Sequence, residues 1–378
     1  MIETVFLPAI WFRSDVEAIA AQTGAALARF DADDLEPVAP GFDLWDMWPI
    51  AQPDGSTAVI DGRRWWFFLA TPQLDDPEAR HDVARMRLTS HGDDGWRDHG
   101  WVFAPGFTPG SREWSGSAVL EDDGETLQLH FTATGHYGGP VSFEQRLFVT
   151  SGRFTVEQGA PSLRFWSEPV ETAVADARWY AATDMLSSPA DGIKGFRDPG
   201  IFRDPADGAD YLLFTGSAID PGDPVDGVVG LARREGERWI MLPPIVTAIG
   251  TNSELERPHI VVHGGRYHLF WSTQRRRFAP DLDAPTGLYA MVADNLAGPW
   301  QPANGTGLVA CNPPEAPMQA YCWWVTGELD VISFADYPGV AAWLAPADAA
   351  TRRLHFGGTV APWFSLEIDG DAIRIARP

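Results

Sequence analysis

Five short acidic or aromatic-polar clusters recur along this chain, and four of them hold carboxylates. The clusters are Trp45-Asp46-Met47-Trp48-Pro49, Glu113-Trp114-Ser115-Gly116-Ser117, Arg197-Asp198-Pro199, Glu254-Leu255-Glu256-Arg257-Pro258 and Gln319-Ala320-Tyr321. Two carboxyl groups that meet in one pocket can cleave a glycosidic bond if one is an ionised nucleophile and the other an acid that keeps its proton. Their surroundings must therefore differ.

The neighbours of each carboxylate suggest how the surroundings differ. Asp46 lies between two tryptophans, and Asp198 follows Arg197, whose guanidinium favours ionised carboxylates nearby. Glu254 and Glu256 alternate along an expected strand and so point to one face. Two like charges on one face raise the pKa of at least one of them, which suits an acid/base.

The chain has 17 tryptophans, more than an ordinary core requires. Aromatic faces stack on the apolar faces of sugar rings, and an indole N–H can donate a hydrogen bond at the rim. We expect Trp65, Trp66 and Trp239 in the core, and Trp45, Trp114 and Trp323 near the pocket because they lie inside the clusters or just after one.

Similar apolar strands follow the first four clusters, at residues 66–71, 129–134, 211–216 and 267–272. The chain is otherwise divided by Asp-Gly, Asn-Gly and Pro-rich turns, which predicts an all-β fold of short strands. Repeated sheet units around an axis would bring distant carboxylates to one central pocket. Ser14-Asp15 and the alanine-rich run after it predict one N-terminal helix over residues 14–30.

Composition excludes several classes of partner. The net charge is −24, from 28 basic and 52 acidic residues, and Lys194 is the only lysine. Such a field repels nucleic acids and anionic membranes, and no apolar stretch approaches the ~20 residues of a membrane span. No secretory signal is visible at the N-terminus, which predicts a cytoplasmic protein or signal-independent export. Cys311 and Cys322 could form a disulfide if their strands face each other, but two free thiols are favoured.

In this order, Trp-Asp-x-Trp-Pro, Glu-Trp-Ser-Gly-Ser-Ala, Phe-Arg-Asp-Pro and Glu-x-Glu-Arg-Pro resemble the motifs of glycoside hydrolase family 68. That family comprises levansucrases, inulosucrases and related β-fructofuranosidases, many of them extracellular. The resemblance runs from about residue 6 to beyond residue 334. It implies that residues 1–378 form a single five-bladed β-propeller with an axial pocket for sucrose, with no cofactor.

The resemblance also implies roles for individual residues. Asp46 corresponds to the nucleophile, Asp198 beside Arg197 to the transition-state stabiliser, and Glu256 to the acid/base. The other substrate-binding positions that the resemblance implies are Trp45, Trp114, Ser115, Arg197, Glu254 and Tyr321, together with Gln274, whose residue type differs from that of many members.

Three positions depart from the family pattern. Gln274 stands where many members carry a basic residue that binds glucosyl and acceptor groups, Thr215 where many carry glutamate, and Ser253 where calcium-binding members carry aspartate. We therefore expect no bound metal. We also expect hydrolysis of sucrose, or transfer of its fructosyl unit to small sugars to give short oligosaccharides, rather than synthesis of long polymers.

Three alternatives remain open at this stage. They are a polymer-forming levansucrase, an inverting hydrolase similar to arabinanases, and a catalytically silent sugar-binding propeller. Retention of configuration in the product would exclude the second, and glucose release from sucrose would exclude the third.

Overall fold

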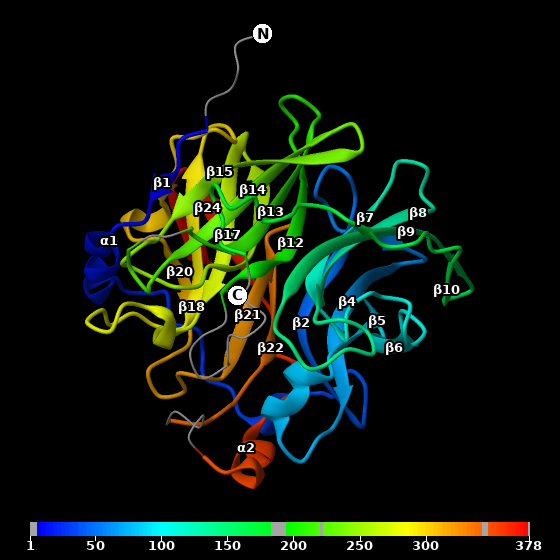
Figure 1. Cartoon of the computed structure of the whole chain (residues 1–378). Helices are drawn as coiled ribbons and strands as arrows, with labels where there is room; N and C mark the ends of the chain where they lie inside the picture. The colour runs from blue at the N-terminus through cyan, green and yellow to red at the C-terminus, as the bar shows by residue number, and fades with distance from the viewer. Residues whose placement is uncertain (1–5, 183–193, 220–221, 342–346, 377–378) are drawn as a thin grey trace.

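The computed structural model describes residues 6–182, 194–219, 222–341 and 347–376, which form strands in four hydrogen-bonded sheets (Figure 1). The largest sheet has the strand order β10-β9-β8-β7-β2-β4-β5-β6, with β11 paired to β9 and β3 to β4. Its strands are β2 (Phe42–Ala51), β3 (Val59–Ile60), β4 (Arg63–Pro72), β5 (Arg85–Gly92), β6 (Gly95–Trp101), β7 (Arg112–Leu120), β8 (Thr126–Thr134), β9 (Gln145–Glu157), β10 (Ala160–Arg164) and β11 (Val170–Glu171).

This sheet consists of two antiparallel halves joined at one short parallel contact. β2 and β7 pair in parallel only through Ile50 with Ala118 and Ala51 with Val119. The remaining neighbours along the sheet are antiparallel, as expected for strands joined by the short turns in the sequence.

The later strands form three smaller sheets, each again mainly antiparallel, and β1 joins the first of these from the start of the chain. The second sheet contains β1 (Ala9–Ile10), β12 (Phe196–Arg203), β13 (Asp210–Ser217), β14 (Gly227–Glu235) and β15 (Arg238–Thr247). The third contains β16 (Glu256–His263), β17 (Arg266–Thr273), β18 (Gly287–Ala293), β19 (Gln301–Pro302) and β20 (Leu308–Cys311). The fourth contains β21 (Ala320–Val325), β22 (Asp330–Ala335), β23 (Thr359–Val360), β24 (Phe364–Asp369) and β25 (Ala372–Ile375).

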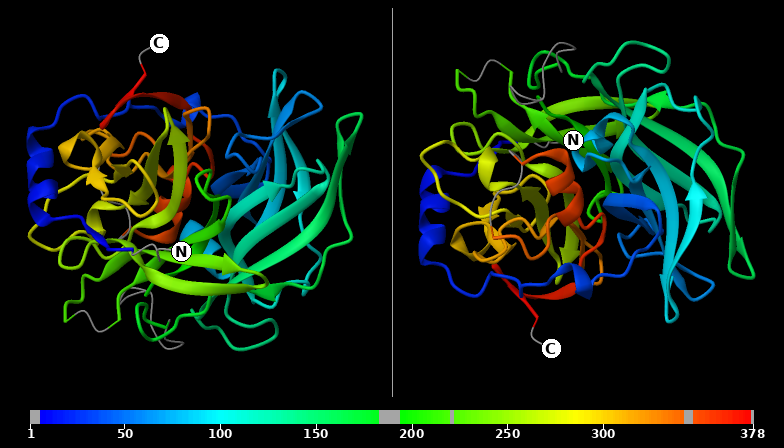
Figure 2. Two further views of the ribbon diagram at one scale, coloured as in Figure 1. Left: turned by 90° about the horizontal axis from the view of Figure 1, so that it is seen from above. Right: turned by 90° about the horizontal axis from the view of Figure 1, so that it is seen from below.

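Five strands, β2, β7, β12, β16 and β21, form the centre of the molecule. Each contacts the next, and β21 contacts β2 again, so the contacts close into a ring. The views in Figure 2 show the blue and cyan strands of the largest sheet on one side and the green, yellow and orange strands on the other. Each of these inner strands carries one of the clusters found in the sequence, which confirms the all-β prediction and the central position of the clusters.

A break in strand pairing occurs within each inner strand. The register shifts between Trp45 and Trp48 in β2, and at the matching point of β7, β12, β16 and β21. Four of the five breaks contain a non-glycine residue with positive φ: Asp46 (44°), Asp198 (61°), Arg257 (54°) and Cys322 (56°). This left-handed backbone is costly for such residues and is typical of functional sites.

The N-terminal helix is much shorter than the predicted span 14–30. α1 covers Arg13–Glu17 and continues as a 3₁₀ turn over Ala18–Ala21, and Gln22 is already extended. The alanine-rich run then crosses to the third sheet, where the Leu27 amide donates a 2.9 Å hydrogen bond to the Cys311 carbonyl. Tertiary pairing therefore outweighs the helix propensity of the alanines.

The other helical segments are short and lie between strands. α2 (Ala349–His355) lies against the 3₁₀ turn η3 (Pro77–Asp82), at the lower end of the molecule in Figure 1. The remaining 3₁₀ turns are η2 (Ala32–Asp34), η5 (Arg275–Arg277) and η6 (Ala303–Gly305). Within the described residues, no helix is long and apolar enough to cross a membrane.

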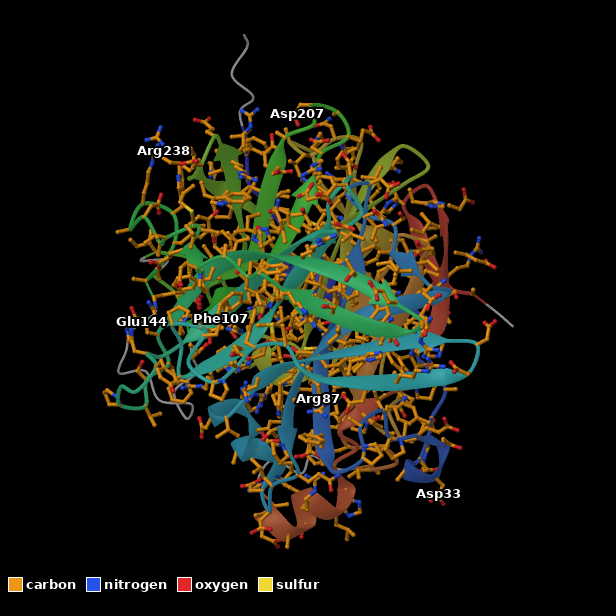
Figure 3. The ribbon with its side chains drawn as sticks, turned by 90° about the vertical axis from the view of Figure 1, so that its right-hand side faces the viewer. Asp33, Arg87, Phe107, Glu144, Asp207 and Arg238 are labelled. Carbon is orange, nitrogen blue, oxygen red and sulfur yellow. The ribbon has the colours of Figure 1, made fainter. Side chains whose placement is uncertain are left out.

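The core is rich in aromatic side chains, and many charged groups lie at the periphery. Trp65 and Trp66 are fully buried, as predicted, whereas Trp239 is only partly buried and packs against the edge of the core. Arg238, Asp207 and Asp33 are exposed and lie at the edges of the molecule in Figure 3.

Gly116 lies at the break in β7, and we predict that Gly116→Ala destabilises the protein strongly. A Cβ there would sit 1.9 Å from the His130 carbonyl oxygen of the neighbouring strand, so the backbone must move. We expect a loss of about 3 kcal/mol in the free energy of unfolding, measured by denaturant titration. Gly124→Ala is the control, because Gly124 (φ 71°) has no atom near its would-be Cβ and should cost only about 1 kcal/mol. Equal losses in the two variants would refute close packing at the β7 break.

Candidate active site

A cavity of about 500 Å³ opens at one end of the inner strands. Every site residue predicted from the sequence lines it: Trp45, Asp46, Trp114, Ser115, Arg197, Asp198, Glu254, Glu256, Gln274 and Tyr321. Trp323 was expected near the pocket, but it is fully buried and is not among the lining residues, so this prediction was wrong. A second cavity, of about 550 Å³, lies toward the other end of the same strands and contains none of these residues.

The breaks in the inner strands explain how so many side chains reach one cavity. On a regular strand, consecutive side chains point to opposite faces. At the breaks this alternation fails, and pairs of consecutive residues line the cavity together: Trp45 with Asp46, Trp114 with Ser115, Arg197 with Asp198, and Tyr321 with Cys322. In the fourth strand only Glu256 lines the cavity, and Arg257 points elsewhere.

Asp198 is held by hydrogen bonds to both of its carboxylate oxygens. Ser115 Oγ donates to Oδ1 at 2.6 Å and Thr215 Oγ1 donates to Oδ2 at 2.9 Å. The Asp198 amide also donates to Thr132 Oγ1 at 2.9 Å. Burial raises the pKa of Asp198, and the adjacent Arg197 opposes that effect. The carboxylate is thus fixed in orientation from two neighbouring strands.

Arg197 links the acidic side chains of the cavity. Its guanidinium donates to Glu256 at 2.6 Å and to Glu254, and lies 3.4 Å from Asp198. Only 6% of Arg197 is exposed, so these charges interact with little screening by water. The sequence-based expectation that Arg197 keeps neighbouring carboxylates ionised agrees with this geometry.

Glu256 differs from the sequence-based expectation in its protonation. Burial favours the neutral acid, but Arg197, the Tyr321 hydroxyl and Arg277 outweigh burial and lower the pKa of Glu256. Glu254 is not a neighbour on the same strand, because β16 begins only at Glu256. Glu254 instead reaches the cavity from the preceding loop and pairs with Arg277 as well as Arg197.

The pKa of Asp46 is shifted in the direction opposite to that of Glu256. Burial raises its pKa to about 6, even though Arg257 and a hydrogen bond from Cys322 lower it. Asp46 is therefore ionised at neutral pH and protonated below about pH 6. In the substrate-free cavity, the pKa shifts of Asp46 and Glu256 are therefore opposite to those that a nucleophile at Asp46 and an acid at Glu256 require.

Sequence reasoning missed the residues that enter the cavity from turns. η3 and the segment after β22 contribute Glu78, Arg80, His81, Asp336 and Tyr337. Arg80 donates to Glu78 at 3.0 Å, Tyr337 donates to Glu78 at 2.9 Å, and the Trp114 indole donates to the His81 carbonyl at 3.2 Å. η3 therefore orients one of the aromatic walls.

Two arginines near Gln274 were also missed. Arg276 and Arg277, from η5, line the cavity beside Gln274. The only signal in the sequence was the run Arg275-Arg276-Arg277 directly after Gln274. Basic groups are thus present on this side although Gln274 itself is neutral.

Both cysteines are free thiols, as favoured from the sequence. Among the residues that the structure describes, no group of three or more His, Cys, Asp or Glu side chains is arranged to hold a metal ion.

Comparison with known proteins gives a consistent result. The levansucrase/invertase profile of glycoside hydrolase family 68 matches residues 2–221 and 224–376. A levansucrase of Pseudomonas syringae pv. actinidiae is 30% identical over 96% of this chain and 90% of its own length. A levansucrase of Rahnella aquatilis is 28% identical over 98% of this chain and 95% of its own length. Among solved structures, an inulosucrase from Halalkalicoccus jeotgali bound to kestose has a TM-score of 0.88 and 35% identity, covering 98% of this chain and 95% of its own.

Thr215 connects two of the inner strands at the site, and we predict that Thr215→Val lowers stability more than an ordinary buried threonine substitution. Its hydroxyl donates to Asp198 and accepts a 3.0 Å hydrogen bond from the Arg257 amide. Loss of a hydrogen bond to a buried charge should cost about 2–3 kcal/mol in the free energy of unfolding.

Thr150→Val is the matched control, because Thr150 is equally buried but donates to a neutral carbonyl, that of Ser167, at 2.7 Å. It should cost about 1 kcal/mol in urea unfolding. If Thr150→Val lowers the free energy of unfolding as much as Thr215→Val does, the hydrogen bond from Thr215 to Asp198 contributes no more to stability than an ordinary one.

Proposed function

The chain belongs to glycoside hydrolase family 68, the levansucrases and invertases, and on this premise we propose that it cleaves sucrose by double displacement through a fructosyl-enzyme intermediate on Asp46. It is a fructosyl-transferring or sucrose-hydrolysing enzyme, as its relatives are. The observation that carries the mechanism is the convergence of Asp46, Asp198 and Glu256 in one cavity, with Arg197 in contact with Glu256 and Asp198.

In the first half of the reaction, Glu256 gives its proton to the glycosidic oxygen while an Asp46 carboxylate oxygen attacks the fructosyl anomeric carbon. The bond from that carbon to the glucosyl oxygen breaks, and glucose leaves. Asp198, held by Ser115 and Thr215, is placed to stabilise the positive charge that develops on the fructosyl ring.

In the second half, water or a sugar hydroxyl attacks the same carbon and releases Asp46. Glu256, now ionised, takes the proton of the attacking group. If the acceptor is water, the products are glucose and fructose. If the acceptor is a sugar, the product is a fructo-oligosaccharide.

Glu256 must be protonated before the first step, yet its pKa is lowered in the substrate-free cavity. Arg197 and the Tyr321 hydroxyl contribute to this lowering, and both are in direct contact with the carboxylate. Hydroxyls of a bound sugar that engage these two groups would weaken their hold on Glu256. Its pKa would then rise in the complex, which couples acid catalysis to substrate binding.

For substrate binding, we propose that Trp45, Trp114 and Ser115 contact the fructosyl unit, with Arg197 and Tyr321 beside it. Similarity to the inulosucrase bound to kestose supports a cavity that takes fructosyl-bearing sugars.

The glucosyl or acceptor side would be formed by Glu254, Gln274, Arg276 and Arg277. The Gln274 side-chain oxygen is buried and has no hydrogen-bond partner among the described residues, so its acceptor capacity is unused in the substrate-free protein. The neutral Gln274 favours water and small sugars as acceptors, whereas the two arginines restore positive charge to this side.

We further propose that residues 1–378 form one five-bladed propeller domain. Each inner strand would begin one blade, and the two halves of the largest sheet would be two blades joined by the short β2–β7 pairing. The closed ring of inner-strand contacts supports this division.

Asp46→Asn is predicted to lower glucose release from sucrose by a factor on the order of 10⁴, because an amide cannot serve as the nucleophile. Free glucose and free fructose are measured enzymatically, and any deficit of fructose against glucose gives the share of transfer. Asp54→Asn changes an exposed aspartate of the turn after β2 and should leave the rate unchanged. Glucose release by Asp46→Asn at the parent rate would remove Asp46 from the reaction. Sucrose binding by the parent protein without glucose release would favour a silent sugar-binding propeller.

A further inference from the structure

Two of the four left-handed residues at the strand breaks have no part in the reaction steps above. Asp46 and Asp198 are the proposed nucleophile and stabiliser, and Arg257 and Cys322 occupy the matching positions of β16 and β21. A strained backbone is kept where it serves a purpose, which directs attention to what these two side chains contact.

Arg257 joins the strands on either side of Asp46. Its guanidinium donates to the carbonyl of Met47, the residue after Asp46, and to the carbonyl of Cys322 at 3.2 Å. Only 2% of Arg257 is exposed, so the group is held within the protein. The backbone around Asp46 and the backbone of Cys322 are therefore fixed to one rigid cation.

Cys322 is placed beside Asp46 by this arrangement. It lines the same cavity as Asp46 and is only 3% exposed, and its thiol acts on the Asp46 carboxylate as a donor group that lowers the pKa of that carboxyl. Burial and the nearby Asp46 and Glu256 raise the pKa of Cys322, so the sulfur keeps its proton and remains a donor. A thiol is a weak donor in water, but a buried carboxylate with few partners strengthens the bond.

We propose that Cys322 is a positioning residue for the nucleophile: its thiol orients the Asp46 carboxylate and stabilises its ionised form. The inference rests on the proposed function, since it takes Asp46 as the attacking group. Cys322 contacts Asp46 rather than the reacting carbon, so it acts through Asp46.

The other charges around Asp46 show why one donor matters. Glu256 and Asp198 both disfavour the ionised form, and Asp336, after β22, is a third carboxyl nearby, whose pKa of about 7 leaves it mostly neutral near pH 6. Arg257 is the cation that acts directly on Asp46.

Two further titratable groups, Arg80 and His81, pack on the Trp45 ring. The Arg80 guanidinium lies 5.8 Å from the Trp45 ring, and His81 packs edge-on to the same ring. Burial and Arg80 lower the pKa of His81 to about 3, so it is neutral. Arg257 and Cys322 thus oppose the carboxyls that disfavour ionisation of Asp46, and loss of the thiol donor should make Asp46 easier to protonate.

The test is the pH profile of kcat/KM for sucrose in the whole enzyme, in which the limb near pH 6 reports the titration of Asp46 in the free enzyme. Cys322→Ala removes the donor but keeps a Cβ, so it adds no strain at this left-handed position, whereas a β-branched residue would. Cys322→Ser keeps a donor. Cys311→Ala is the matched control, because Cys311 is a buried thiol in β20 that is not among the cavity-lining residues.

The limb set by Asp46 should lie near pH 6 in the parent enzyme. In Cys322→Ala it should move up by about 1 pH unit. In Cys322→Ser it should move below the parent value, because a hydroxyl is the stronger donor, and Cys311→Ala should leave it in place. A purely structural role for Cys322 would lower activity or melting temperature without moving the limb.

An active Cys322→Ala with an unmoved limb would overturn the proposal. Should that variant not fold, Cys322→Ser decides alone: a limb at lower pH supports the proposal, and an unchanged or higher limb overturns it. Failure of the proposed function is seen separately, as a parent enzyme that releases no glucose from sucrose.

Discussion

The rest of the structure depends on one constraint. The carboxyl groups that meet between the five inner strands lie largely out of solvent, so their charge must be compensated within the protein. Asp46, Asp198 and Glu256 face a cavity closed off from most solvent, and an unpaired charge in such a place costs several kcal/mol. Arg197 and Arg257, both almost fully buried, supply the compensating charge. Each arginine also binds groups from more than one inner strand, so the ring of strands and the charge balance support each other.

The two arginines act on different carboxyls, and this asymmetry gives the cavity its chemistry. Arg197 faces the cavity, contacts Glu256 directly and contributes to the lowering of its pKa. Arg257 lies behind Asp46 and binds backbone carbonyls, so burial still raises the Asp46 pKa to about 6. Arg197 lines the cavity and Arg257 does not. Under the proposed function, a sugar that engages Arg197 would change the protonation of Glu256 and leave the contacts of Arg257 in place.

The sequence predicted the site residues on inner strands and two residues beside strands, Glu254 and Gln274, and it missed those that lie on 3₁₀ turns. Asp46, Asp198 and Glu256 occur in short motifs that repeat with the strands, so their meeting could be inferred. Arg80 and Arg277 reach the cavity from 3₁₀ turns whose direction depends on tertiary contacts.

The predicted helix over 14–30 failed for the same reason. Pairing with Cys311 redirects a segment whose local composition favours a helix.

The covalent intermediate on Asp46 can be tested most directly by quenching the enzyme rapidly in acid during sucrose turnover and mapping modified peptides by mass spectrometry. One fructosyl unit attached to Asp46 is the predicted result. A fructosyl unit on another residue, or products of inverted configuration with no modified peptide, would contradict the double displacement.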